Sequence, residues 1–258
     1  MTELWNAFTG ALITDWHFYA VAVPAVMLLG LAKSGFLSGF GSLATPLLAL
    51  TVPVPQAAAI MLPLLVVMDA LNIRELFPLR DKALVRLLLP AGLLGTLLGT
   101  LLFGVFSNQA VAAVVGALTL LFLAQRLWMK PRVDGAPPSR WLGGLMGIAS
   151  GFTSFVAHAG GPPIAAYVLP LRLAPVVASA TMATFFAAIN WAKWLPYAWL
   201  GLIDVRNMAT AAVLLPLAPI GVWIGVWALK RVKTEVFYRI AYLGMAAAGL
   251  QLLWQGLR

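Results

Sequence analysis

The chain has 258 residues, of which 62% are hydrophobic and only 10% are charged. A soluble domain carries about 25% charged residues, so this composition excludes a water-soluble enzyme or binding module. The apolar runs are continuous, as in residues 110–123, whereas the strands of a transmembrane barrel alternate apolar and polar residues. The sequence therefore predicts an all-α polytopic membrane protein. We assign the net charge of +9 to basic loops at the membrane surface and expect no nucleic-acid partner.

In chain order, the first long apolar region covers residues 18–73 and is interrupted by a Gly- and Ser-rich run at 33–42. Two uninterrupted segments follow at 82–105 and 109–128, each close to the ~20 residues that cross a bilayer. After a polar, Pro-rich stretch the same order returns, with one interrupted region and two uninterrupted segments, at residues 141–199, 205–229 and 235–254. We predict eight to ten transmembrane segments, some of them broken or re-entrant.

The two halves of the chain share landmarks in the same order. Ser34-Gly-Phe recurs as Ser150-Gly-Phe after 116 residues, and Asn72 is matched by Asn190 after 118. Three further landmarks share an offset of 126 residues: Pro90, Gly95 and Gly99 correspond to Pro216, Gly221 and Gly225. Such matches indicate an internal duplication. We predict a first structural repeat at residues 1–128, a cytoplasmic linker at 129–140 and a second repeat at 141–258.

The distribution of basic residues sets the orientation of the two halves. Twelve of the 17 Lys and Arg residues form three clusters: Arg74, Arg80, Lys82 and Arg86; Arg126, Lys130, Arg132 and Arg140; Lys230, Arg231, Lys233 and Arg239. Basic loops face the cytoplasm, which places both termini outside, on the periplasmic side of the inner membrane. The repeats are then inverted relative to each other. Inverted repeats are characteristic of secondary transporters, whose binding site lies where the repeats meet.

Gly- and Pro-interrupted segments at matching positions point to the binding site of such a protein. A broken helix exposes free N–H groups and the positive end of its dipole, and both favour an anion. The polar residues in and near the two breaks are therefore the substrate-binding candidates: Lys33, Ser34, Ser38, Ser42, Thr45, Asn72, Thr153, Ser154, His158, Gly160, Gly161 and Asn190. The alternative role for the hydroxyls is to satisfy backbone groups that the breaks set free.

Two titratable residues within the apolar segments are candidates for proton coupling. A histidine in a membrane segment is rare and suggests a function, so His158 is expected to bind substrate, carry a proton or orient its loop. Asp69 is expected to pair with Lys33 or Arg74, or to carry a proton. Lys193 lies among aromatic residues typical of a membrane interface, and we predict an interfacial position for it.

The two breaks also carry a resemblance to a known family. Ser34-Gly-Phe-Leu-Ser-Gly39 with Pro46, and above all Gly151-Phe-Thr-Ser-Phe-Val-Ala-His-Ala-Gly-Gly-Pro-Pro163, resemble the sulfite exporter TauE/SafE family, also called the four-toluene sulfonate uptake permease family. The first break departs from the glycine-rich form of that family at Gly39-Phe-Gly41. The resemblance implies proton-linked export of small sulfur-containing anions such as sulfite, sulfoacetate or related sulfonates, without a cofactor.

Other classes of function fit the residues less well. A metalloprotease needs His-Glu-x-x-His, but the chain has only His17 and His158, and the motif of an intramembrane serine protease is absent. We therefore expect neither an enzyme nor a metal site. A passive anion channel, or an uptake permease for small carboxylates or sulfonates, remains the alternative. The expected partners are a small anionic substrate, the lipid bilayer and a second copy of the chain in a homodimer.

Overall fold

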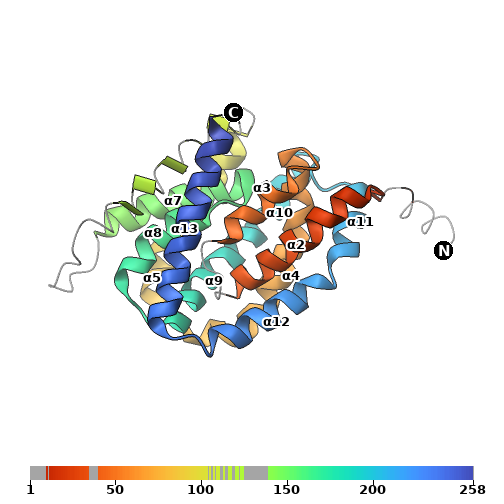
Figure 1. Cartoon of the computed structure of the whole chain (residues 1–258). Helices are drawn as coiled ribbons and strands as arrows, with labels where there is room; N and C mark the ends of the chain where they lie inside the picture. The colour runs from red at the N-terminus through yellow and green to blue at the C-terminus, as the bar shows by residue number, and fades with distance from the viewer. Residues whose placement is uncertain are drawn as a thin grey trace.

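The computed structural model describes residues 10, 12–34, 40–103 and 139–257, together with scattered positions between 105 and 124. Within these residues the fold consists of α-helices and short 3-10 turns, as Figure 1 shows. Five helical segments are long and apolar enough to cross a membrane: Trp16–Lys33, Val54–Leu79, Lys82–Leu101, Pro175–Trp199 and Glu235–Gly256. The all-α membrane class is therefore confirmed.

The first half begins with α2 (Trp16–Lys33), whose N-terminus is capped by the Asp15 carboxylate accepting from the His17 N–H. The rest of the half follows as η1 (Phe40–Leu43), α3 (Ala44–Leu48), α4 (Val54–Leu76), η2 (Phe77–Leu79) and α5 (Lys82–Leu101). Pro55 occupies the first turn of α4, where its missing N–H costs no hydrogen bond. The expected interruption after Lys33 is present, because α2 ends there and only short helices precede α4.

The second half opens in the same way as the first. It consists of α7 (Arg140–Ala157), α8 (Gly161–Val168), η3 (Leu169–Leu171), α9 (Pro175–Ala192), α10 (Trp194–Trp199), α11 (Val205–Leu214), α12 (Leu217–Leu229) and α13 (Thr234–Gly256). A long helix, a break and a short helix thus open both halves. This order is consistent with the predicted inverted repeats.

One segment differs from its predicted form. Residues 205–229 were expected to form one uninterrupted helix, but α11 and α12 are separated at Leu215–Pro216 and bent by 47°. Pro216 lacks the N–H for a helical hydrogen bond, and its ring collides with the preceding turn. Counted as one span, the bent pair raises the membrane-crossing helices to six among the described residues. The predicted total of eight to ten stays a prediction, since most of 109–128 lies outside them.

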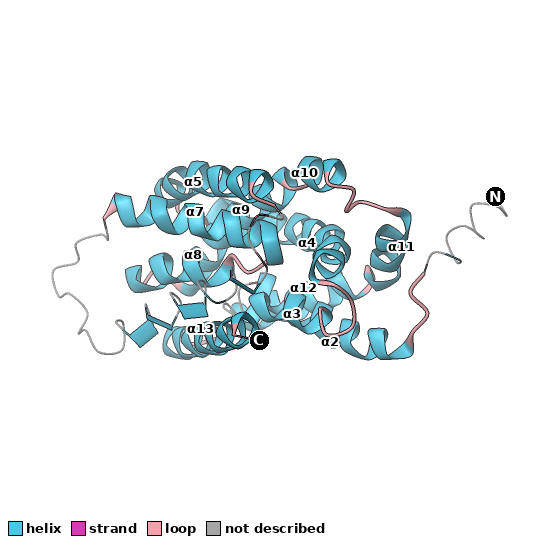
Figure 2. Cartoon of the chain, turned by 90° about the horizontal axis from the view of Figure 1, so that it is seen from above, coloured by secondary structure: helices cyan, strands magenta, loops and turns pink. Residues whose placement is uncertain are grey.

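The two most extensive helix contacts between the halves each pair a late helix of one half with the first described helix of the other. In Figure 2, α5 runs beside α7 and α12 beside α2. A Cβ on Gly95 would lie 2.0 Å from the Ile148 carbonyl oxygen, and one on Gly225 would lie 1.9 Å from the Ser34 Oγ. Glycine is therefore required for this approach, as in other membrane helix pairs.

Candidate functional site

The second break is formed by residues 158–160, between α7 and α8. His158 is in the left-handed conformation, with φ of 51°, and its N–H donates to the Ser154 carbonyl at 3.1 Å. The hydroxyls of Ser150 and Thr153 donate to the carbonyls of Gly160 and Ala159, at 2.7 and 3.1 Å. These hydroxyls satisfy backbone groups that the break removes from the helix, which was the alternative role expected for such residues.

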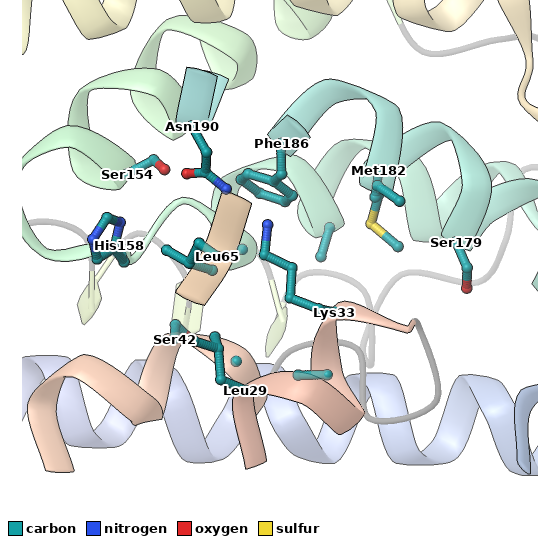
Figure 3. Close-up of a pocket in the computed structure, with 15 residues that line it drawn as sticks. Leu29, Lys33, Ser42, Leu65, Ser154, His158, Ser179, Met182, Phe186 and Asn190 are labelled. Carbon is teal, nitrogen blue, oxygen red and sulfur yellow. The ribbon is translucent and has the colours of Figure 1, made fainter. Parts of the chain in front are cut away.

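A cavity of about 90 Å³ lies between the two breaks. Six of the predicted substrate-binding residues line it: Lys33, Ser42, Ser154, His158, Gly161 and Asn190. Three residues of α9 that the sequence reasoning missed also line it: Ser179, Met182 and Phe186. Figure 3 shows the Lys33 amino group directed toward the Phe186 ring, with His158 and Ser154 on the opposite side of Leu65. The Lys33 Nζ lies 5.2 Å from the centre of that ring.

Lys33 forms a buried ion pair beside the cavity. Its Nζ donates to Asp69 Oδ1 at 2.7 Å, and the Asp69 side chain is fully buried. The second carboxylate oxygen accepts from Asn190 Nδ2 at 2.7 Å. Of the two partners proposed for Asp69 from the sequence, the structure selects Lys33. Because a carboxylate only accepts, Asn190 must present its amide nitrogen to Asp69 and its oxygen to the other side.

Lys193 is not interfacial, and the prediction of that position is wrong. The side chain is fully buried, because the turn between α9 and α10 directs it inward. Its Nζ lies 2.6 Å from the Ser154 carbonyl, 2.8 Å from Ser154 Oγ, 3.0 Å from His158 Nδ1 and 3.0 Å from Asn190 Oδ1. One clue was available in the sequence: Lys193 follows Asn190 by three residues, which places both on one face of a helix.

His158 is held between Lys193 and helix α4. Its Nε2 lies 2.9 Å from the Ala58 carbonyl oxygen, which can only accept, so Nε2 carries a hydrogen. In the neutral ring Nδ1 is then an acceptor, and it faces Lys193 at 3.0 Å. A hydrogen-bonded chain therefore runs from Lys33 through Asp69, Asn190 and Lys193 to His158.

The remaining predicted residues that the structure describes are not part of the cavity wall. The hydroxyl of Ser34 donates to the Leu31 carbonyl at 2.6 Å. Thr45 and Asn72 are buried, and their side-chain polar atoms have no hydrogen-bond partner among the described residues. Thr153 and Gly160 take part in the hydrogen bonds of the second break. Ser38 lies outside the residues that the structure describes.

Helix α8 directs its N-terminus toward the cavity but contributes few donors. Gly161 is its first residue and lines the cavity. Pro162 and Pro163 follow, and neither has an N–H. The expected cradle of free N–H groups is thus reduced at this helix to the Gly161 N–H and the helix dipole. Charge at the cavity must come mainly from the lysines.

The described residues contain no group of three His, Cys, Asp or Glu side chains placed to hold a metal ion. The ionisable side chains at the site are instead two amines, one carboxylate and one imidazole, linked in a chain. Such a set can bind an anion and move protons between neighbouring heteroatoms.

Broken helices beside a cavity that Lys33 and His158 line, among helices able to cross a bilayer, define the molecule as a polytopic membrane protein of the transporter type. The model of the family described as sulfite exporter TauE/SafE matches residues 22–252. The chain therefore belongs to this family of membrane transporters, and the resemblance drawn from the two breaks is confirmed. Searches of curated proteins and of solved structures gave no match.

Proposed function

We propose that the protein exports small sulfur-containing anions, such as sulfite, sulfoacetate or related sulfonates, across the inner membrane, and that this export is linked to protons. Both termini lie on the periplasmic side in this proposal. The observation that carries it is the set of ionisable groups in and next to the cavity wall. Two amines, those of Lys33 and Lys193, are linked through hydrogen bonds to a single carboxylate, that of Asp69. Charges inside a membrane protein are costly unless paired, so this interior favours an anion.

The size of the cavity supports a small substrate. A volume of about 90 Å³ compares with the roughly 10–15 Å³ that one enclosed water needs on the same measure. A sulfite ion or a short sulfonate fits this space, whereas a nucleotide or a lipid does not. At the cavity wall, the Lys33 ammonium supplies charge, and Gly161 is the first residue of α8.

Alternating access between two inverted repeats is the transport mechanism we propose. The cavity lies between the two breaks, and the contacts of α5 with α7 and of α12 with α2 join the halves around it. Rocking at these two contacts would open the cavity to one side and then the other. His158 and Asp69, the candidates for proton coupling, both belong to the hydrogen-bonded chain at the cavity.

The test is efflux of sulfite and sulfoacetate from proteoliposomes, with and without a pH gradient, for the wild type and for His158→Ala. Saturable, gradient-dependent efflux that His158→Ala reduces at least tenfold is expected. The control is His17→Ala, because His17 is exposed at the start of α2. No flux of either anion would refute the substrate class, and flux indifferent to pH and to His158 would favour a channel.

A further inference from the structure

We propose that Lys193 is the proton-binding group of this transporter and that it takes up a proton when an anion enters the cavity, so that anion and proton cross together. This inference rests on the proposed function and names the residue that couples it to protons. Lys193 does not line the cavity, but it contacts three residues that do: Ser154, His158 and Asn190.

Among the residues that the structure describes, no acidic side chain contacts Lys193 directly. Its partners are a backbone carbonyl, a hydroxyl, an amide oxygen and an imidazole nitrogen. The charged side chains whose field reaches it within the described part of the chain are Lys33 and Asp69, and these two already form an ion pair with each other. The nearby Tyr197 hydroxyl donates to the Phe155 carbonyl. A buried ammonium here would be uncompensated.

The same four partners satisfy Lys193 in both protonation states. A neutral amine has two hydrogens and one lone pair. It can donate to the Ser154 carbonyl and to Asn190 Oδ1. Its lone pair can accept from the Ser154 hydroxyl, whose Oγ lies 2.8 Å away, when the hydroxyl hydrogen turns toward Nζ. An ammonium has three hydrogens, and the third is donated to His158 Nδ1 at 3.0 Å. When Lys193 gains a proton, the Ser154 hydroxyl turns its hydrogen away from Nζ, because an ammonium has no lone pair. The change of protonation state needs only this rotation, and the heavy atoms of the four partners can stay in place.

A short route connects the cavity with Lys193. The Ser154 side chain lines the cavity and its Oγ lies 2.8 Å from Nζ. The hydroxyl oxygen takes a proton from the cavity side while its own proton passes to the lone pair of Nζ. The hydroxyl is regenerated, and the amine becomes an ammonium. No other group changes its charge in this step.

Charge balance links the proton to the anion. With the cavity empty, Lys33 and Asp69 neutralise each other and Lys193 is a neutral amine. An anion adds a negative charge next to Lys193, and protonation of Lys193 then offsets it. Because such coupling is reciprocal, protonation must strengthen anion binding by the same factor as the anion favours protonation. The two ligands therefore move in one direction, and the outward gradient of the anion drives export of both.

The experiment is calorimetric titration of the purified protein with sulfoacetate, carried out in two buffers of different ionisation enthalpy. Sulfoacetate stays fully ionised between roughly pH 6 and 9, because the reference pKa values of carboxyl groups are lower. The difference between the buffers gives the number of protons taken up per anion. We expect about one proton for the wild type and about a tenfold loss of affinity per pH unit as the pH rises, since one proton is linked to one anion.

Two variants separate proton binding from a structural role. Lys193→Gln removes the basic group, and it is expected to bind the anion at least tenfold more weakly, without proton uptake. Lys193→Arg stays protonated throughout, and it is expected to retain binding that no longer depends on pH. The matched control is Lys82→Gln, because Lys82 is exposed at the start of α5, and it should take up one proton as the wild type does.

Each outcome separates this inference from the proposed function. If the wild type binds the anion without taking up a proton, the inference is overturned but the proposed function is not. The same holds if folded Lys193→Gln and Lys193→Arg still take up a proton on binding. Failure of the wild type to bind sulfoacetate or sulfite overturns the proposed function and, with it, the inference. A monodisperse elution profile shows that each variant is folded.

Discussion

The two halves of the chain contribute different chemistry to the same cavity. The predicted repeat pairs Ser42 with His158, and both line the cavity. It also pairs Asn72 with Asn190, but their surroundings differ. Asn190 bonds to Asp69 and Lys193, whereas the amide of Asn72 is buried without a partner among the described residues. Matching positions thus supply a common framework, while the interactions made from them differ.

Two ionisable residues of the site have no ionisable counterpart in the other half. At the same offsets, Lys33 corresponds to Ala149 and Asp69 to Ala187, neither of which ionises. The first half therefore supplies the permanent ion pair, and the second supplies the imidazole of His158 and the amine of Lys193. Two similar repeats can open the cavity in equivalent ways to the two sides of the membrane. The charged residues and the proton-binding residue serve the same cavity in both states, so one half alone can supply each of them.

The largest effect is expected when the ion pair of the first half is broken. Asp69→Asn leaves the Lys33 ammonium buried without a counter-charge, which costs about 3–5 kcal/mol. Thermal unfolding in detergent measures it. The control is Glu75→Gln, because the Glu75–Lys230 pair is half exposed and such pairs contribute about 0–1 kcal/mol. Equal losses in both variants would contradict the assignment of Lys33–Asp69 as an interior pair.

The two asparagines give the sharpest comparison between the halves. Asn190→Leu removes hydrogen bonds to Asp69 and Lys193, and a bond to a charged group contributes about 1.5–3 kcal/mol. Asn72→Leu removes an unpaired buried amide, so stability should be unchanged or increased. Unfolding and sulfite efflux should both be measured. Loss of efflux in stable Asn72→Leu would show that Asn72 acts in a second conformation and that the halves are more alike than this structure indicates.

The helix contacts that join the halves should differ in their tolerance of a methyl group. A Cβ on Gly95 would lie 2.0 Å from a backbone oxygen, whereas one on Gly221 has its nearest neighbour, Gly30 Cα, at 3.1 Å. Gly95→Ala is expected to destabilise by about 1–3 kcal/mol through overpacking, and Gly221→Ala by less. Gly144→Ala, with no atom within 4 Å, is the control and should not destabilise. A reversed order in thermal unfolding would refute the packing.

Part of the site could be predicted from the sequence because breaks in apolar segments have a local cause. Prolines and glycines mark them, and the chain must satisfy the freed backbone groups nearby. This reasoning found Lys33, Ser42 and His158, which line the cavity, and it gave Lys33 as one of two possible partners of Asp69. It failed for Lys193, because an aromatic neighbourhood is typical of a membrane interface and a sequence does not show the direction of a side chain at a helix end.

The amino-acid sequence by itself determined the membrane class, the order of long and broken helices, and the family, because hydropathy, proline and glycine act over a few residues or one turn. Only the tertiary structure decided which polar residues share the cavity and how they are paired. Asp69 and Asn190 are 121 residues apart in the chain and 2.7 Å apart in space. Such a contact depends on how α4 and α9 pack against each other. That packing is set by side chains from many helices and not by the local sequence of either one.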